Sequence, residues 1–305
     1  MFDLAQASDV LSIPRAEFPS RNPHPAALPA AARAPVADLP QTTALREERL
    51  PFVITIASDE SSLRDAVAMR QAAYGRHLPD LAATLSEPET SDREPGAIVL
   101  MARARLDGAV LGTMRIQTNR YQALHLEDSA PLPAWLDSAA LAEATRLGVV
   151  AGPVGRVVKT ALFKAFYQYC LLSGIDWMVI TARPPLHRQY EALMFTDVFP
   201  GQDLIPMAHV GGIGHRVLAL DVAQARTRWQ SAGHPLFAYM CLTHHPDLRL
   251  GMPGQNAEEE AVSVAERGRE VGPVPVEANV GAHLRDLSFS ADEVRCVAAG
   301  FSLAV

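Results

Sequence analysis

Two opposite charges stand in an otherwise apolar segment, LAEATRLGVV, at residues 141–150. The segment predicts a buried strand, where Glu143 and Arg146 cost free energy unless they are paired or used in chemistry. A regular strand would place these two side chains on opposite faces of its sheet. A bulge between them would re-aim one side chain, and bulges are over-represented beside active sites. The structural alternative is a salt bridge with Arg115 or Arg70.

A helix and a loop earlier in the chain carry further groups of this kind. Arg70 and Tyr74 are spaced i, i+4 in a segment of helical periodicity, so both side chains project from one helix face. The loop at 86–96 is acidic, with carboxylates at Glu87, Glu89, Asp92 and Glu94. The alternatives are an arginine packed over an aromatic ring on the surface, and a solvated loop.

A basic helix start follows the strand. The chain reads AGPVG, ending at Gly155, and then places positive charge at Arg156, Lys159 and Lys164. The two lysines are the only ones among 27 basic residues. Free backbone N–H groups at a helix start bind anions. A strand, a glycine turn and a basic helix start suit the phosphopantetheine arm of a thioester donor, and the same helix suits an acidic carrier protein.

The elements that must position these residues follow from hydrophobic periodicity and turn signals. Asp107–Gly108 predicts a hairpin turn in which both residues have positive φ. Residues 51–250 are therefore expected to form one α/β (α+β) domain, a mixed and mostly antiparallel sheet flanked by helices. The predicted strands are 51–58, 97–106, 109–117, 141–150, 177–182, 195–199 and 215–221, and the predicted helices are 61–78, 156–174, 185–195 and 222–250.

Composition limits the function classes. Residues 1–50 hold seven prolines and eleven alanines, which predicts a disordered extension, and 251–305 is expected to be a loosely ordered tail. A net charge of −7 argues against nucleic-acid binding. Three cysteines without a CxxC pair argue against structural zinc. No membrane-length apolar run and no secretory signal are evident, so a cytoplasmic location is expected.

The element order, the hairpin GAVLGTMRI and the sequence YEALMF at 190–195 resemble GNAT acyltransferases. YEALMF is similar to their Y-x-x-x-G-F, with Met194 in place of glycine. More narrowly, the chain resembles the FeeM-type N-acyl amino acid synthases and the related acyl-homoserine-lactone synthases. Four motifs in order carry this resemblance over residues 52–225: Arg70 with Tyr74, Glu89 with Asp92, Gly112 with Arg115, and Glu143 with Arg146.

Departures from the pattern separate the branches. Homoserine-lactone synthases carry a tryptophan after the first motif, where this chain reads GRHLPDLAA, and their acidic pair is two aspartates where this chain has Glu89. The resemblance therefore favours the amino-acid-acylating branch. The sequence VVAGPVGR keeps little of the GNAT pyrophosphate loop, which fits a carrier-protein donor without adenosine. Two alternatives stay open: a homoserine-lactone synthase using S-adenosylmethionine, and a catalytically silent carrier-binding module.

The resemblance implies attack of an amino acid's α-amine on a fatty acyl thioester, with no metal and no cofactor other than the carrier's phosphopantetheine. Glu143 is the expected general base, because an apolar strand raises the pKa of a carboxyl group. The expected acceptor site comprises Arg70, Tyr74, Glu89, Asp92, Arg115 and Arg146, although the family also allows these charges to hold the loop to the sheet. The expected donor and carrier site comprises Leu147, Val149, Gly155, Arg156, Lys159 and Lys164, with N–H groups around Leu147–Val149 as the oxyanion donors.

Overall fold

The computed structural model of the chain describes residues 45–251. Most of the predicted extension (1–50) and nearly all of the predicted tail (251–305) lie outside the described residues. Secondary structure starts before Pro51, because strand β1 (Arg46–Glu47) pairs in parallel with β10 (Thr243–His244). Leu50 is also buried.

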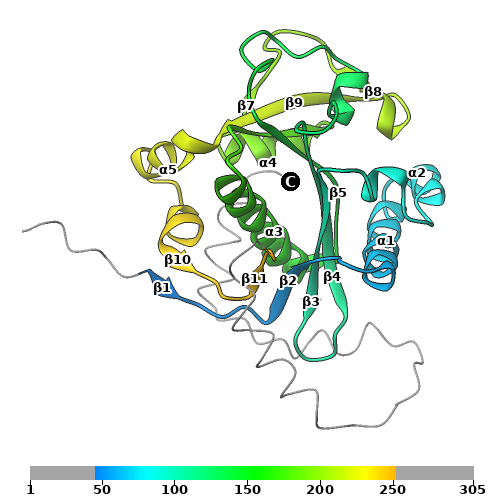
Figure 1. Cartoon of the computed structure of the whole chain (residues 1–305), viewed down its shortest axis with the longest axis vertical. Coiled ribbons are helices and arrows are strands. Elements are labelled where there is room, and N and C mark those ends of the chain that lie inside the picture. Colours follow the sequence, from blue (N-terminus) through cyan, green and yellow to red (C-terminus); the bar gives the residue numbers. More distant parts are fainter. Residues whose placement is uncertain (1–44, 252–305) are drawn as a thin grey trace, which may run out of the picture. The chain divides into compact units, whose positions relative to one another are not determined.

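One mixed sheet forms the centre of the described part (Figure 1). Its strands β11 and β2, and its strands β5 and β6, pair in parallel, while the other neighbours are antiparallel. This confirms the predicted fold class. The strand order is β11 (Leu248–Arg249), β2 (Phe52–Ile56), β3 (Ala97–Ala104), β4 (Val110–Thr118), β5 (Leu141–Val149), β6 (Trp177–Ala182), β9 (Ile213–Asp221) and β7 (Thr196–Asp197), and β8 (Ile205–Met207) also pairs with β9.

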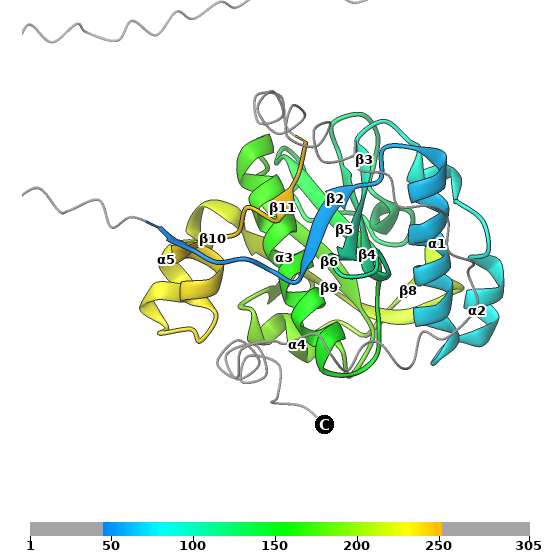
Figure 2. The same ribbon diagram turned by 90° about the horizontal axis from the view of Figure 1, so that it is seen from below.

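Helices cover both faces of the sheet, as Figures 1 and 2 show. Helices α1 (Glu60–Gly75) and α2 (Pro79–Thr84) lie on one face, and α3 (Gly152–Ser173) lies on the other with α5 (Val222–Ser231) packed beside it. Short helical turns complete the fold: η1 (Thr90–Asp92), α4 (His187–Ala192), η2 (His125–Asp128), η3 (Ala208–Val210) and the π-helical η4 (Ala238–Leu242).

Local sequence explains where the two long helices begin and end. Asp59 caps α1, since its Oδ1 accepts a hydrogen bond from the backbone N–H of Ser62 at 2.7 Å. Gly174 ends α3 with φ of 60°, as predicted for a C-terminal glycine. The start of α3 differs from the prediction, because residues 152–155 belong to the helix. A Cβ at Gly155 would overlap the carbonyl oxygen of Val150, so only glycine fits this close approach.

Side-chain alternation along the strands divides the core into two layers. Ala142 and Ala144 of β5 pack toward α3, together with Met114, Phe166 and Ile180. Leu141 packs on the opposite face, in a cluster that includes Leu124, Leu126, Val179 and Val217. Glu143 alternates with Ala142 and Ala144, so its carboxyl group lies on the second face, under η2.

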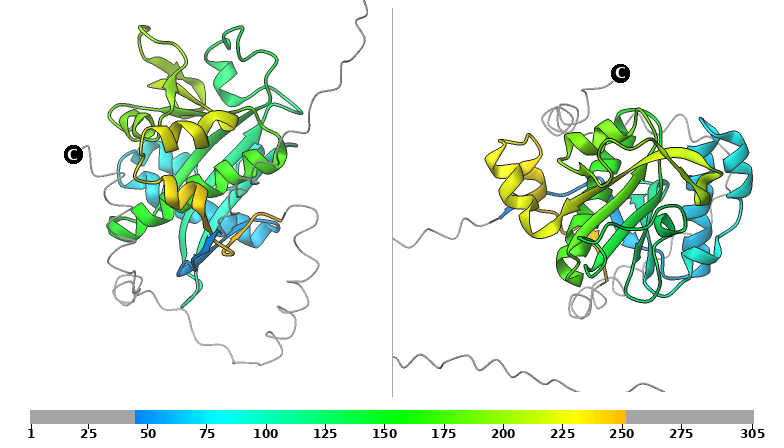
Figure 3. Two further views of the ribbon diagram at one scale, coloured as in Figure 1. Left: turned by 90° about the vertical axis from the view of Figure 1, so that its left-hand side faces the viewer. Right: turned by 90° about the horizontal axis from the view of Figure 1, so that it is seen from above.

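Two predicted details are wrong. In the hairpin, Gly108 has φ of 73° but Asp107 has no positive φ, and the pairing register of β3 with β4 shifts at Ala102/Arg103. The predicted helical cover over 222–250 ends at Ser231 apart from the η4 turn, and the chain then adds β10 and β11. Pro246 disfavours helix for the residue before it. Figure 3 shows β11 beside β2 at the edge of the sheet.

Candidate active site

A gap opens between two parallel strands at the centre of the sheet. Parallel pairing joins Leu141–Ala144 of β5 to Trp177–Ile180 of β6 and ends there, although both strands continue. A cavity of about 380 Å³ lies where they part. Both strands line it, and it reaches helices α1, α3 and α4 and the η3–β9 segment. Partly open clefts of this size between elements are typical ligand sites.

A bulge shapes the β5 side of this cavity. Arg115 of β4 pairs with Thr145, whereas Thr113, two residues earlier, pairs with Gly148, so β5 holds one extra residue. Arg146 lies in this bulge with φ of 55°, a conformation that costs energy for a residue with a side chain. The bulge therefore lies at Arg146 itself rather than between Glu143 and Arg146. It aims the Arg146 side chain at the acidic loop.

The four predicted motifs meet in one buried group, which we call the arginine–carboxylate cluster: Arg70, Arg115, Arg146, Glu89 and Asp92. Arg70 donates to both Oδ atoms of Asp92 at 3.0 and 2.9 Å, and to Glu89 at 3.1 Å. Arg146 donates to Glu89 from Nε and Nη2 at 2.7 and 2.6 Å. Arg115 donates to Glu89 at 3.2 Å and to Asp92 at 3.3 Å.

This cluster is neutralised largely from within. Burial acts to raise the pKa of Glu89, but the hydrogen bonds and charge of Arg146 outweigh it and lower that pKa to about 2. The side chains of Arg70 and Asp92 are fully buried. The sequence left two roles open for these residues: binding the acceptor, or holding the acidic loop to the sheet. The geometry fits the second role, because the arginines join the η1 loop to α1 and to the sheet.

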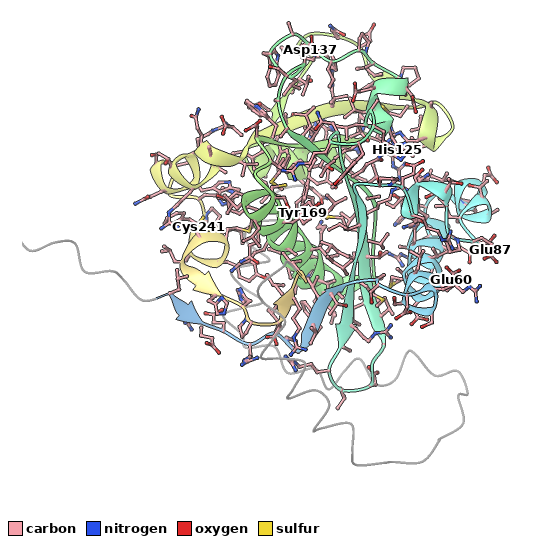
Figure 4. The ribbon with its side chains drawn as sticks, in the orientation of Figure 1. Glu60, Glu87, His125, Asp137, Tyr169 and Cys241 are labelled. Atoms are coloured by element: carbon pink, nitrogen blue, oxygen red, sulfur yellow. The ribbon has the colours of Figure 1, made fainter. Side chains whose placement is uncertain are left out.

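Glu143 lies behind the cavity wall rather than in it. Its carboxyl group is fully buried, and Oε2 accepts a hydrogen bond from the backbone N–H of Leu126 at 3.3 Å. Among the described residues, Oε1 has no partner. Burial raises the pKa of Glu143 to about 7. Figure 4 shows His125, the neighbour of Leu126, on the side of the sheet that carries α1 and α2.

Five predicted site residues do line the cavity: Tyr74, Arg146, Leu147, Val149 and Lys159. Lys159 is half-buried and its Nζ donates to Oε1 of Gln189 at 2.6 Å. Burial lowers the pKa of Lys159 to about 8, and the charge of Arg156 adds to this effect. Apolar side chains supply much of the remaining wall, among them Leu78, Leu81, Met114, Phe163 and Ile180.

Three predicted donor-site residues lie elsewhere. Arg156 is exposed on α3, and Gly155 is buried against β5 outside the cavity lining. Lys164 is a correction, because its side chain is fully buried and turned away from any docking partner. Its Nζ donates to the carbonyls of Tyr239 and Thr243, each at 2.6 Å, and contacts Nδ1 of His245 at 2.7 Å. Lys164 therefore anchors the 238–245 segment to α3.

The cavity lining also includes polar residues that the sequence did not indicate as site residues: Arg76, His77, Thr145, Thr181, Arg183, Gln189, Tyr190, His209 and His215. Tyr190 begins the YEALMF sequence that resembles the GNAT motif, and burial raises its pKa. Burial and the charge of Arg146 lower the pKa of His209 to about 3. Arg183 directly follows one predicted strand and His215 begins another. Their positions at strand ends were the feature of the sequence that could have indicated a site. None of the described residues that line this cavity is Asp or Glu.

Two kinds of feature are absent from residues 45–251. No group of three or more His, Cys, Asp or Glu side chains there is arranged to hold a metal ion. No helix in this part of the chain combines the length and apolar character needed to cross a membrane.

Comparison with known proteins gives a family match. Residues 65–210 match the family model described as N-acyl amino acid synthase FeeM. A comparison with curated proteins found no match. The match confirms the resemblance predicted from the sequence, and acyl transfer is accordingly the reaction class of this chain.

Solved structures with a similar arrangement include three from acyl-transfer enzymes. FeeM, an N-acyl amino acid synthase from uncultured soil microbes, is 20% identical with a TM-score of 0.48, covering 58% of this chain and 93% of that one. BjaI, a CoA-dependent acyl-homoserine lactone synthase, is 17% identical with a TM-score of 0.42, covering 64% and 93%. The acyl-homoserine-lactone synthase LasI is 15% identical with a TM-score of 0.42, covering 56% and 90%.

Proposed function

We propose that this protein transfers a fatty acyl group from the phosphopantetheine thioester of an acyl carrier protein to the α-amine of an amino acid. One observation carries the proposal: the cavity between β5 and β6 joins apolar walls to a cationic lining without carboxylates. Apolar walls suit an acyl chain. Cationic side chains suit the phosphate of the donor and the carboxylate of the acceptor.

The β5 strand supplies N–H groups for the thioester. The backbone N–H of Val150 donates to the carbonyl of Leu111 at 2.9 Å, toward β4. Successive N–H groups of a strand point to opposite sides, so those of Val149 and Leu147 point toward the gap between β5 and β6. In the proposed reaction they hold the pantetheine amides and the oxyanion that forms when the amine attacks.

The outer end of the cavity suits the phosphate of the carrier arm. Lys159 lines the cavity, and Arg156 is exposed one helical turn earlier on α3. The first residues of α3 have no side-chain cap, so their N–H groups add to the anion-binding character of this end. A carrier protein, which is acidic, would contact Arg156 directly.

The reaction forms one bond and breaks another. The amine nitrogen attacks the thioester carbon, the C–S bond breaks, and the products are an amide and the free thiol of the carrier. An α-amine is largely protonated at neutral pH, so an acceptor for its proton is required. Glu143 does not line the cavity, and it takes part only if water connects its carboxyl group to the amine.

The purified protein, a loaded acyl carrier protein and a panel of amino acids provide the test, with mass spectrometry of the products. We expect an N-acyl amino acid and a stoichiometric amount of free carrier thiol. A homoserine lactone formed only with S-adenosylmethionine would replace this proposal with the synthase alternative. No product from any carrier-bound chain length would favour the silent binding module, for which Met194 at φ of 69° in the family's glycine position is the motivating departure.

A further inference from the structure

We propose that Arg183 and His215 form the acceptor subsite, in which the guanidinium binds the carboxylate of the amino acid and the imidazole takes the proton of its α-amine. The inference rests on the proposed function and names the residues that recognise the acceptor. Neither residue belongs to the four motifs that carry the family resemblance.

Strand pairing brings the two residues together. β6 and β9 are antiparallel, with Thr181 paired to Val217 and Ala182 paired to Arg216. Extending this register by one residue carries Arg183 alongside His215. Both residues line the cavity. Burial is the main cause that lowers the pKa of His215, and the charge of Arg183 also lowers it. Strand alternation also puts them on the face that carries Val217.

The hydrogen bond of His215 leaves its second nitrogen available as an acceptor. Nδ1 lies 2.7 Å from the carbonyl oxygen of Ile213, and a carbonyl only accepts, so Nδ1 carries the proton. Nε2 of the neutral ring is then the acceptor. Burial, with the charge of Arg183, lowers the pKa of His215 and keeps the ring neutral near pH 7. The residue as a whole is 8% exposed, and it lines the cavity.

The arginines among the described residues of this cavity lining are Arg76, Arg146 and Arg183. Arg76 is exposed and donates to the carbonyl oxygen of Val149 at 2.6 Å. Arg146 is held by both oxygens of Glu89. Within residues 45–251, by contrast, no carboxylate lies within ion-pair distance of Arg183, and no acidic side chain lines the cavity. Arg183 is half-buried, and a guanidinium without a carboxylate partner in the protein is suited to bind the carboxylate of a ligand.

An α-amino acid matches the pair in both size and charge. Its amine and carboxylate are attached to one carbon, so they need two adjacent partners of different character. With Arg183 on the carboxylate, the amine faces His215. The bound ammonium first loses one proton to solvent, which gives the neutral amine. Nε2 of His215 removes a second proton as the nitrogen bonds to the thioester carbon, and passes it to the thiolate that leaves when the C–S bond breaks.

Glu143 is too far along the sheet to share this role directly. It pairs with Val179, and Arg183 lies four residues further along the chain beyond β6. At about 3.3 Å per residue, the two positions are roughly 13 Å apart along the strand direction. His209 of η3 interacts electrostatically with His215. The other charged or titratable residues of the described cavity lining are Tyr74, Arg76, His77, Arg146, Lys159 and Tyr190.

The test compares acceptors that differ only in the carboxylate: leucine with 3-methylbutylamine, and phenylalanine with 2-phenylethylamine. For Arg183→Met we expect KM for the amino acid to rise about 10- to 100-fold while the amine is used as by the wild type. Arg183→Lys should recover part of this loss. Arg188→Met is the matched control, because Arg188 is exposed on α4 and does not line the cavity.

His215→Gln tests the other half of the pair. We expect kcat to fall by about 10²-fold or more for amino acid and amine alike, with little change in KM. Equal use of amino acid and amine by the wild type, or unchanged discrimination in a folded Arg183→Met protein, would overturn the subsite and leave the proposed function standing. If the wild type acylates no amino acid at all, the proposed function fails first and the subsite with it.

Discussion

Arginine side chains stand in two different surroundings within residues 45–251. In the arginine–carboxylate cluster, Arg70, Arg115 and Arg146 face Glu89 and Asp92, and every one of these arginines has a carboxylate partner. In the cavity, Arg183 stands beside a neutral His215 without such a partner. An arginine therefore stabilises the fold in the cluster, whereas in the cavity it is available to bind a ligand. The residue type is the same in both places, and the presence or absence of a carboxylate partner distinguishes the two roles.

The largest effect is expected from breaking the cluster. Arg70→Met leaves the buried carboxylate of Asp92 with Arg115 as its one cationic partner among the described residues, beside the backbone N–H of Glu89. Removing one partner of a buried ion pair costs about 3–5 kcal/mol. Chemical denaturation should show this loss. Arg183→Met should change the free energy of unfolding by less than about 1 kcal/mol. Similar losses in both variants would erase the distinction between the two arginine sites.

The second prediction concerns the pH dependence of stability. Burial raises the pKa of Glu143 to about 7, above its value near 4.5 in the unfolded chain. The folded state therefore binds more protons between these values, so this group's contribution to stability is greatest below pH 4.5 and is lost as pH rises to about 7. The loss is about 3 kcal/mol. Glu143→Gln should remove this slope, as urea unfolding at several pH values can check.

The Glu143→Gln variant also distinguishes the two candidate general bases, Glu143 and His215. If His215 takes the proton, Glu143→Gln should reduce kcat clearly less than His215→Gln does, measured with one amino acid and one loaded carrier. An equal or larger loss in Glu143→Gln would return the base role to Glu143. It would also require a water connection between the carboxyl group and the cavity.

Much of the arginine–carboxylate cluster could be predicted, because the spacing of its residues in the sequence indicates which side chains share a face. Arg70 with Tyr74 marks a helix face, and the bulge explains how Arg146 can leave a buried strand to reach Glu89. Lys164 was misplaced because helical spacing gives a face but does not reveal what covers it. The residues that cover it, 239–245, return about 75 positions later in the chain. Arg183 and His215 were missed for a related reason: adjacent strands in the sheet need not be adjacent in sequence, so the pairing of β6 with β9 could not be read.

A smaller effect is expected at the donor end. With Lys164 buried, the accessible basic pair on α3 is Arg156 and Lys159. Arg156→Glu with Lys159→Glu should reduce kcat/KM for a loaded carrier protein about tenfold more than for a small pantetheine thioester, because charge complementarity acts on protein association. Arg64→Glu, exposed on α1, is a control for a single charge reversal outside this end. Equal losses on both donors would mean that this end binds no carrier surface.

Acceptor discrimination tests the central contrast most directly: the ratio of kcat/KM for an amino acid to that for its decarboxylated amine, measured in Arg183→Met and in Arg70→Met at a temperature where both are folded. We predict that the ratio falls about 10- to 100-fold in Arg183→Met and stays near the wild-type value in Arg70→Met. The reverse, with discrimination lost in the cluster variant and kept in the cavity variant, would contradict the assignment of the two arginine sites.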